Sequence, residues 1–452
     1  MTGRQDVDTI VAIATPAGYG GIGVIRVSGP KTADIARSLL GLLPAPRQAK
    51  HARFLGAQGE LLDDGIALYF SAPHSFTGDD VLELQGHGGP VVLNRVLRQC
   101  LALGARQARP GEFSERAFLN GKMDLVQAEA VADLISSASD AAAKAALASV
   151  TGEFSRRVHK LTESVIQLRA YIEAAIDFTD EEIDFLAASQ VNERLITTQS
   201  ELAELLEHAR QGQMLHEGLT VVIAGPPNAG KSSLINQLAG DEVAIVTPIA
   251  GTTRDLVRAR LVIDGLPVQF VDTAGLRSSD DVVEQEGIRR AQQAMTTASR
   301  ILLVLDGRDV AADHSLWPTY RDQLPNVPVT VIFNKCDLTN AEPGWECCGQ
   351  TSVLRLSAHT GAGINLLREH LKECAGYAGE AASPISARRR HVEALQQTQR
   401  HLKAARDQHA MGAGELMAEE LRSAQHTLGE ITGEFTNDDL LGRIFSSFCI
   451  GK

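Results

Sequence analysis

A nine-residue stretch, Gly225–Ser233 with the sequence GPPNAGKSS, has the residue types and spacing of a loop that binds phosphate. It follows the apolar run Leu219–Ala224, which predicts a buried strand, and it precedes residues that can begin a helix. Glycines let backbone N–H groups turn toward phosphate oxygens, and Lys231 would place a positive charge beside the β- and γ-phosphates. The Ser232 hydroxyl can ligate Mg²⁺. The stretch therefore predicts a nucleoside triphosphate site.

Two further motifs are suited to sensing the γ-phosphate. Asp272–Gly275 (DTAG) follows an apolar run, so a strand would bring Asp272 near Mg²⁺ and the final N–H of the motif near the γ-phosphate. Gly251–Asp255 (GTTRD) lies between the phosphate loop and that strand. Thr253, or alternatively Thr252, can close on Mg²⁺ when the γ-phosphate is present.

The last two motifs point to guanine as the base. Asn334–Asp337 (NKCD) follows a third apolar run, and the Asp337 carboxylate can accept hydrogen bonds from guanine N1–H and its 2-amino group. Adenine lacks that pair of donors, and a site built for them rejects it. Ser357–His359 (SAH) follows another strand-like run and fits the loop behind the base. The five motifs in this order predict a domain that binds and hydrolyses GTP.

The predicted GTP-binding residues come from all of these motifs. They are Asn228, Ala229, Gly230, Lys231, Ser232, Ser233, Thr247, Thr252, Thr253, Asp272, Thr273, Ala274, Gly275, Asn334, Lys335, Asp337, Ser357, Ala358 and His359. Lys231 is also a catalytic candidate, and Ser232 and Thr253 are the predicted Mg²⁺ ligands.

Hydrolysis needs a further source of charge. Leu276 occupies the position after DTAG where many GTPases carry a water-positioning Gln, and no arginine finger is evident in the phosphate loop. The side-chain carbonyl of Asn228 can bind a monovalent cation, and backbone carbonyls within Thr247–Thr252 could complete its shell. Glu284 is a candidate for placing the water; the alternative is a solvated acid in an acidic stretch.

Length and charge bound the remaining possibilities. The 452 residues are enough for two to four domains, and the net charge of −13 argues against a general nucleic-acid coat. Six cysteines without CxxC spacing, and no signal peptide, suggest a reducing cytoplasm. No apolar run reaches the roughly 20 residues that a membrane span needs.

The chain before the phosphate loop divides into two parts. Residues 1–120 predict a mixed α/β domain with strands at Thr9–Ala14 and Gly23–Ser28. The turn Gly18–Gly23 between them matches GxGxxG, but a strand follows where a dinucleotide site needs a helix, so it predicts a glycine-rich hairpin. From Leu125 to about Arg210 the sequence is helical and rich in alanine.

Helical sequence also follows the GTPase motifs. Apolar residues recur at helical spacing in three stripes: Leu161, Val165, Leu168, Ile172 and Ala175; Val392, Leu395, Leu402 and Ala405; and Leu416, Leu421, Leu428 and Ile431. Because helices flank the GTPase on both sides, the economical prediction is one all-α domain, discontinuous in sequence, with the α/β P-loop GTPase inserted into it. The predicted segments are 1–120, 121–215, 216–378 and 379–452.

Three local features have competing interpretations. His87 lies among glycines, but no second metal ligand stands at a useful spacing. The acidic run Asp177–Asp184 could hold a cation, but the favoured interpretation is a solvated helix–helix link. The basic cluster Arg388–His391 reads as a solvated helix start, with an RNA phosphate contact as the alternative.

The order of motifs resembles one family over essentially the full length, the bacterial tRNA modification GTPases called MnmE or TrmE. The shared series comprises Ala14–Pro16, Gly20–Gly23, Leu84–Gly89, Arg109–Leu119 (RPGEFSERAFL), Ala174–Phe178, the GTPase motifs and the terminal Cys449–Lys452 (CIGK). The resemblance implies that K⁺ occupies the cation site, held by Asn228, Thr247, Ile249 and Thr252, and that Glu284 orients the attacking water.

The resemblance also implies a folate site. The family's N-terminal domain binds a one-carbon tetrahydrofolate, either 5-formyl or 5,10-methylene, and forms a homodimer. Arg26, Glu83, Lys122 and Lys452 match its folate residues. A carboxylate such as Glu83 can pair with the amide edge of a pterin, and cations suit the folate carboxylates. Cys449 matches the family's terminal cysteine, as a nucleophile or in a redox-silent role.

The family installs an aminomethyl or carboxymethylaminomethyl group on C5 of the wobble uridine of certain tRNAs. It works with MnmG, a partner that uses FAD and NADH, and this chain shows no credible FAD fingerprint of its own. The expected cofactors are therefore GTP, Mg²⁺, K⁺ and the folate, with FAD through the partner. Two other function classes remain: a ribosome-assembly GTPase without modification chemistry, and a stand-alone folate enzyme with a regulatory GTPase.

Overall fold

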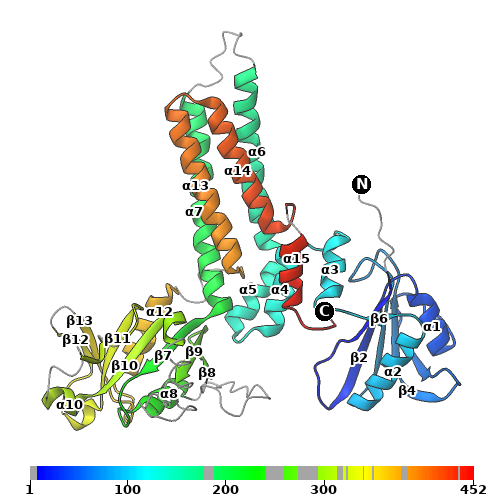
Figure 1. Cartoon of the computed structure of the whole chain (residues 1–452), viewed down its shortest axis with the longest axis horizontal. Helices are drawn as coiled ribbons and strands as arrows, with labels where there is room; N and C mark the ends of the chain where they lie inside the picture. Colours follow the sequence, from blue (N-terminus) through cyan, green and yellow to red (C-terminus); the bar gives the residue numbers. More distant parts are fainter. Residues whose placement is uncertain are drawn as a thin grey trace, which may run out of the picture. The chain divides into compact units, whose positions relative to one another are not determined.

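The structure, a computed structural model, describes residues 8–177, 188–240, 258–272, 294–312, 319–321, 324–339, 341–348, 351–377, 385–435 and 438–451. The chain forms two compact units (Figure 1). The first comprises Met1–Ala132, Val150–Val191 and His401–Lys452, and the second comprises Asp133–Ser149 and Asn192–Arg400.

The first unit contains a six-stranded sheet with the order β3-β4-β5-β2-β1-β6. Its strands are β1 (Ile10–Ile13), β2 (Gly20–Ser28), β3 (Lys50–Leu55), β4 (Leu61–Phe70), β5 (Val81–Gly88) and β6 (Arg106–Gln107). Neighbours are antiparallel except β1 and β6. As expected, the glycine-rich turn joins β1 and β2 as a hairpin.

Two helices cover one face of this sheet, α1 (Thr32–Leu40) and α2 (Pro90–Ala102) (Figure 1). They bury Leu39 and Val96 against Ile25 and Leu84 of the sheet. Since side chains alternate along a strand, Arg26 and Glu83 lie on the other face. The sequence patterns had not predicted α1 or β3.

Strand β5 continues through its glycine-rich end as far as Gly88. A Cβ on Gly88 would lie 2.5 Å from the carbonyl oxygen of Gly20, so the two glycines allow β2 and β5 to approach closely. These glycines therefore extend the pairing of the two strands.

Helices complete the first unit: α3 (Glu112–Leu119), α4 (Leu125–Ser136), α6 (Glu153–Asp177), α14 (Gly414–Thr432) and α15 (Asp438–Ser446). α6 packs along α14 (Figure 1), and the predicted α6 stripe from Leu161 to Ala175 is buried. The stripe on α14 was misplaced. Leu416 is 57% exposed, and Met417 instead heads a buried row with Leu421, Ala424, Leu428 and Ile431. The row's alternating steps of four and three keep it on one helical face.

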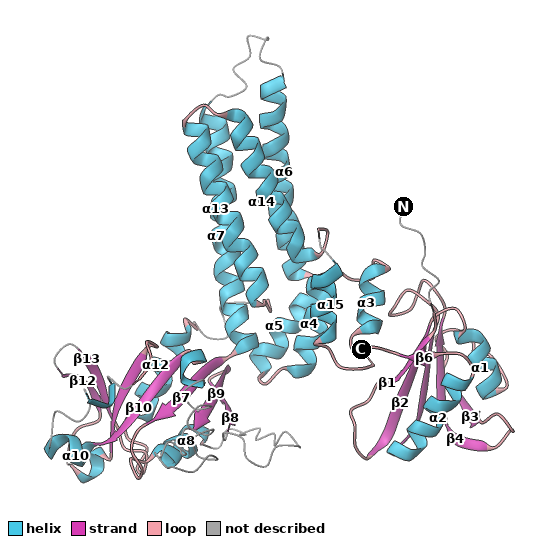
Figure 2. Ribbon diagram, in the orientation of Figure 1, coloured by secondary structure: helices cyan, strands magenta, loops and turns pink. Residues whose placement is uncertain are grey.

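The second unit contains a seven-stranded sheet with the order β12-β13-β11-β10-β7-β9-β8 (Figure 2). Its strands are β7 (Leu219–Ala224), β8 (Arg258–Ile263), β9 (Leu266–Asp272), β10 (Arg300–Asp306), β11 (Val329–Asn334), β12 (Gly344–Cys348) and β13 (Thr351–Arg355). Five are parallel, and β8 and β12 are antiparallel edge strands.

Both faces of this sheet are buried. One face packs against α8 (Lys231–Ala239) and α12 (Ile364–Ala375), and the other against α10 (Gly307–Ala312) and Met295. Adjacent residues such as Leu302 and Leu303 therefore belong to different cores. Such a sheet leaves the carboxyl ends of its strands as the place for polar side chains.

The remaining elements are α5 (Asp140–Val150), α7 (Ala188–Glu217), α13 (Arg389–Ala410) and the short 3₁₀ helix η1 (Cys336–Leu338). α7 ends immediately before β7, and α13 begins after α12 and the connection that follows it. The P-loop domain is thus inserted between helices, as the sequence predicted. Among the described residues, no helix combines the length and apolar character that crossing a membrane requires.

Candidate nucleotide site

The predicted phosphate loop connects β7 to α8, and close packing determines its shape. Gly225 has φ +138°, and a Cβ there would lie 2.0 Å from the Val304 carbonyl oxygen. Gly230 has φ +96°, and its Cβ would lie 2.2 Å from Asn334 Nδ2. No side chain fits at either position, so the glycines are needed both for conformation and for space.

The loop ends at the N-terminus of α8. Lys231 is the first residue of that helix, and its Nζ donates to the carbonyl oxygens of Gly225 (2.9 Å) and Pro226 (2.8 Å). Ser232 and Ser233 follow and are exposed. The first turn therefore presents backbone N–H groups, two hydroxyls and an ammonium group, all of which favour an anion.

Asn334 joins three of the predicted motifs. It is 2% exposed, and its Nδ2 donates to the carbonyl oxygen of Ala229 in the phosphate loop (2.8 Å). Its Oδ1 accepts the backbone N–H groups of Lys335 (2.8 Å) and Ala358 (2.9 Å). The role of Asn334 here is to fasten loops together.

Asp337 lies beside this junction with its carboxylate exposed. Ser357 Oγ donates to Asp337 Oδ1 at 2.5 Å, which orients the carboxylate. The adjacent His359 is exposed. The geometry suits an acceptor that reads donors on a planar base.

Lys335 connects the same loop to the phosphate loop by a second route. Its backbone has φ +67°, and its Nζ donates to the carbonyl oxygen of Asn228 (2.7 Å) and to Asp306 Oδ2 (2.7 Å). Sequence reasoning missed Asp306. The available signal was its position as an acid at the end of a fully apolar strand, where parallel sheets gather polar groups.

Several predicted residues fall outside the described residues. They are Thr247, Ile249, Thr252, Thr253, Thr273, Ala274, Gly275, Glu284 and Lys452, together with the side chain of Asp272. The backbone of Asp272 is described as the last residue of β9, paired in register with Ile223 of β7. It therefore lies at the same sheet edge as the phosphate loop.

The predicted folate residues are only partly brought together. Arg26 and Glu83 are register partners on β2 and β5, and Arg26 Nε and Nη2 both bond Glu83 Oε1 (2.9 and 2.8 Å). Phe76 and Phe113 lie 5.4 and 5.7 Å from the guanidinium. Lys122 is exposed and donates to the Pro73 carbonyl oxygen (3.0 Å).

The C-terminal tail reaches this part of the first unit. Arg26 Nη1 donates to the carbonyl oxygen of Gly451 (3.4 Å), and a Cβ on Gly451 would lie 2.6 Å from the Ile13 carbonyl oxygen. Cys449 is exposed, and its carbonyl oxygen accepts the N–H of Gly111 (3.3 Å). The tail is thus tucked against β1 and β2.

His87 has neighbours that sequence spacing could not reveal. Its Nδ1 lies 2.7 Å from Asp63 Oδ1, and its backbone N–H donates to Asp63 Oδ2. The hydrogen bond to Asp63 raises the pKa of His87. Asp64 completes a group whose ligand atoms lie within 4.8 Å of one another. Sequence spacing could not reveal these neighbours, because strand pairing brings them to His87 from β4.

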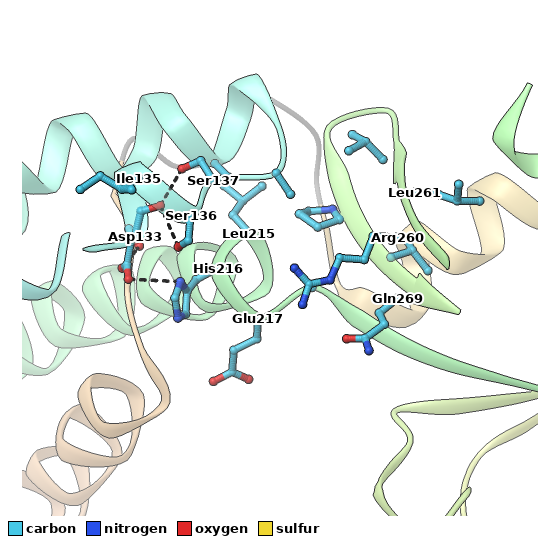
Figure 3. A pocket seen from close by; sticks show the side chains of 17 residues that line it. Asp133, Ile135, Ser136, Ser137, Leu215, His216, Glu217, Arg260, Leu261 and Gln269 are labelled. Carbon is cyan, nitrogen blue, oxygen red and sulfur yellow. Dashed lines mark hydrogen bonds and ion pairs between the residues drawn. The ribbon is translucent and has the colours of Figure 1, made fainter. Parts of the chain in front are cut away.

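A cavity of about 430 Å³ lies in the second unit where the helices meet β8 and β9 (Figure 3). Beside it, the buried Asp133 carboxylate accepts hydrogen bonds from Arg388 (2.6 Å) and Ser386 (2.9 Å) and lies 3.3 Å from His216 Nδ1. One carboxylate thereby joins the chain that enters the inserted domain to the chain that leaves it.

This network corrects the reading of the basic cluster. Arg388 is paired with buried Asp133, and His391 is 1% exposed and accepts the N–H of Arg388 through Nδ1 (3.0 Å). Neither residue is part of a solvated helix start, and Arg388 is already engaged by a carboxylate. The local sequence around Arg388 does not show that a buried carboxylate, that of Asp133, lies beside it.

Comparison with known proteins adds two family matches. A model described as the MnmE helical domain matches residues 125–449, and one described as the GTP-binding protein TrmE N-terminus matches residues 9–122. The tRNA modification GTPase MnmE of Ectopseudomonas mendocina is 57% identical over 450 residues, covering 98% of this chain and 99% of the relative. That of Pseudomonas aeruginosa is 58% identical with the same coverage. Among solved structures, the G domain of the T. maritima FeoB iron transporter is 22% identical and covers 35% of this chain and 98% of its own, with a TM-score of 0.27.

Proposed function

Because the chain belongs to the MnmE (TrmE) family of tRNA modification GTPases, we propose that it binds and hydrolyses GTP at the loop Gly225–Ser233. The observation that carries this proposal is the hydrogen bonding of Asn334 to Ala229 and Ala358, with the Ser357–Asp337 bond beside it. It joins the phosphate loop to the two loops suited to guanine.

Each part of the loop has a task in this proposal. The N–H groups at the start of α8 and the Lys231 ammonium bind the β- and γ-phosphates. Ser232 and Thr253 would hold Mg²⁺, and Asp272 would be near it. These residues suit Mg²⁺ for two reasons. Hydroxyl and carboxylate oxygens are ligands that Mg²⁺ prefers. Asp272 also pairs in register with Ile223, close to the start of the phosphate loop. The ion would neutralise charge that develops on the phosphates.

Potassium is the proposed source of the remaining positive charge. Asn228 is exposed, and its backbone has φ +62°. Its side-chain oxygen, with Thr247, Ile249 and Thr252, would bind K⁺ more readily than Na⁺, because neutral oxygens replace the weaker hydration of the larger ion more easily. Glu284 would orient the attacking water.

Potassium dependence is the first test. We expect faster GTP hydrolysis by the full chain in KCl than in NaCl at equal ionic strength, at protein concentrations that allow the P-loop domains to pair. Asn228→Ala should abolish the difference and leave GTP affinity nearly unchanged. Equal wild-type rates in the two salts would overturn the cation mechanism while leaving GTP binding intact.

The GTP cycle would serve modification of the wobble uridine. The chain would act as a homodimer in the cytoplasm with tRNA and the FAD-dependent partner MnmG, adding an aminomethyl or carboxymethylaminomethyl group at C5. Arg26, Glu83, Lys122 and Lys452 would bind a 5-formyl- or 5,10-methylene-tetrahydrofolate, which supplies the one-carbon unit. The Arg26–Glu83 pair, which is partly exposed on the sheet face opposite α1 and α2, supports this assignment. Cys449, exposed beside that region, would act as a nucleophile.

Mass spectrometry of tRNA nucleosides tests the modification. A strain lacking the gene should lose the C5 modification at the wobble position, and wild type should restore it. Complementation with Arg26→Ala should fail although the variant still hydrolyses GTP. Unchanged wobble uridine in the deletion strain, with unprocessed ribosomal particles, would favour a ribosome-assembly GTPase.

A further inference from the structure

We propose that Asp306 is a positioning residue for nucleotide binding, which holds Lys335 against the phosphate loop and so couples the guanine-reading loop to the Asn228 carbonyl. This inference rests on the proposed GTP binding and adds a residue that none of the five sequence motifs contains. Asp306 ends β10, where it is paired in register with Asn334, the last residue of β11.

The first step concerns the hydrogen bonds between the phosphate loop and the guanine-reading loop that follows β11. Two successive carbonyl groups of the phosphate loop accept hydrogen bonds from two successive side chains, that of the last residue of β11 and that of the residue after it. Asn334 Nδ2 holds the carbonyl of Ala229 (2.8 Å), and Lys335 Nζ holds the carbonyl of Asn228 (2.7 Å). The Asn334 contact is made by a short, buried side chain, whereas the Lys335 contact depends on a long and flexible one.

The second step is what immobilises the Lys335 side chain. Its Nζ also lies 2.7 Å from Asp306 Oδ2, and the Asp306 side chain is 7% exposed while that of Lys335 is 23% exposed. A lysine side chain carries considerable rotamer entropy, which binding would otherwise have to remove. With Asp306 and the Asn228 carbonyl as two fixed acceptors, the ammonium is already in place before a nucleotide arrives.

The third step is that Asp306 remains an anion. Arg308 donates to both of its oxygens, from Nη2 (2.7 Å) and from Nε (3.1 Å), and the Arg308 backbone N–H adds a third bond (3.0 Å). These bonds and the one from Lys335 outweigh burial and hold the pKa of Asp306 well below its usual range. The anchor is therefore charged at any pH where the protein works.

The consequence for the site follows from position. Asn228 supplies the proposed potassium ligand and precedes the carbonyl that Asn334 holds. Lys335 lies between Asn334 and the guanine-reading Asp337. If the Lys335 side chain were mobile, the phosphate loop and the guanine-reading loop would both lose a contact that orders them. Nucleotide affinity should then fall, whereas the fold and the catalytic residues should be unchanged.

The experiment compares Asp306→Asn with Asp309→Asn in the full chain. Both changes remove one carboxylate charge, but Asp309 is an exposed neighbour on α10. Dissociation constants for GDP and GTP would be measured with fluorescent analogues, and kcat at saturating GTP in the same buffer. Because the lost contacts are charge-assisted, we expect Asp306→Asn to raise both constants about tenfold or more, with kcat within about twofold and Asp309→Asn indistinguishable from wild type.

A double-mutant cycle with Lys335→Gln separates positioning from general damage. In the Lys335→Gln background, Asp306→Asn should have little further effect on GDP affinity, because the side chain that it positions is gone. Additive losses would overturn the proposal, as would wild-type affinity in Asp306→Asn. Failure of the wild-type chain itself to bind GTP would instead overturn the proposed function.

A measurement on the wild-type chain tests whether Lys335 is held in place without relying on variants that could fail to fold. Labelling with an amine-reactive reagent, read by mass spectrometry, should modify Lys335 more slowly than the exposed Lys403 of α13, because the Lys335 ammonium is held by two acceptors. Labelling of Lys335 at the rate of Lys403 would refute the anchored lysine without any substitution.

Discussion

The two sheets of this chain place their charged side chains in opposite ways. In the antiparallel sheet of the first unit, Arg26 and Glu83 face each other in the middle of β2 and β5. In the parallel sheet of the second unit, Asp306 and Asn334 are the final residues of β10 and β11. The large core of the first sheet lies on the face covered by α1 and α2, and the other face has only a small apolar cluster around Ala12 and Phe113, whereas both faces of the second sheet carry large apolar cores.

The difference shows that coverage of a sheet decides where a binding site can form. A sheet covered on one face keeps the other for polar groups in mid-strand, so neighbouring strands can present a charge pair across their register. A sheet covered on both faces excludes charges from its interior because burying them unpaired is costly. Its polar groups gather where the strands end, and the phosphate loop begins there too.

The largest effect should come from a residue just beyond a strand end. Asp337→Asn should lower GTP affinity by roughly 10⁴ and favour xanthosine triphosphate, because the amide offers a donor where xanthine has an acceptor. Stability should change by only about 0.5 kcal/mol or less, since the side chain is exposed. Titration with both nucleotides and a thermal melt would check this. Retained GTP affinity would show that guanine is read elsewhere.

A second prediction compares neighbouring positions in the two sheets. Leu302→Ala and Leu303→Ala should each cost about 2–5 kcal/mol, because the two side chains fill different cores of the parallel sheet. Leu84→Ala should cost a similar amount, whereas Gln85→Ala should cost about 0.5 kcal/mol or less because it points away from the helix-covered face.

Hydrogen exchange of strand peptides in the full chain measures these losses sheet by sheet. Matched losses at Leu302 and Leu303, with unequal losses at Leu84 and Gln85, would support the comparison. Equal effects at Leu84 and Gln85 would mean that both faces of the antiparallel sheet are packed, and the contrast would fail.

The smallest effect concerns acid stability of the first unit. Burial raises the pKa of Glu112, but hydrogen bonds from Arg106, the Arg109 backbone N–H and Arg116 outweigh it and lower the pKa to about 2. A depressed carboxyl pKa contributes stability that is present above the unfolded value near 4.5 and is lost as the pH falls toward 2. The contribution is about 3 kcal/mol.

Glu112→Gln isolates this contribution. The variant should be less stable than wild type at pH 7, and the difference should shrink between pH 4.5 and 2, as followed by circular dichroism melts. Glu204→Gln, which removes a carboxylate charge from an exposed position on α7, serves as the matched control. A difference between wild type and Glu112→Gln that stays constant over this pH range would exclude titration of Glu112 as its cause.

Local sequence was sufficient for the nucleotide loops and for most of the helices. A phosphate loop needs glycines at particular positions, a lysine and a helix start within a few residues, and all of these are visible as a motif. An amphipathic helix likewise repeats its pattern over a short window, as α6 does. On α14, Met417 is buried and Leu416 is not. When two apolar residues are adjacent, the sequence pattern does not decide which of them faces the core.

Contacts between residues that are distant in the sequence were decided only by the tertiary structure. Arg26 bonds Glu83 across 57 residues, and Arg388 meets Asp133 across 255. Asp306 holds Lys335 from a neighbouring strand, and His87 finds its carboxylate on β4. Each of these contacts depends on strand register or helix packing, which many distant residues set together. The sequence by itself determined which groups could bind a nucleotide, and the packing of distant segments determined which groups hold them in place.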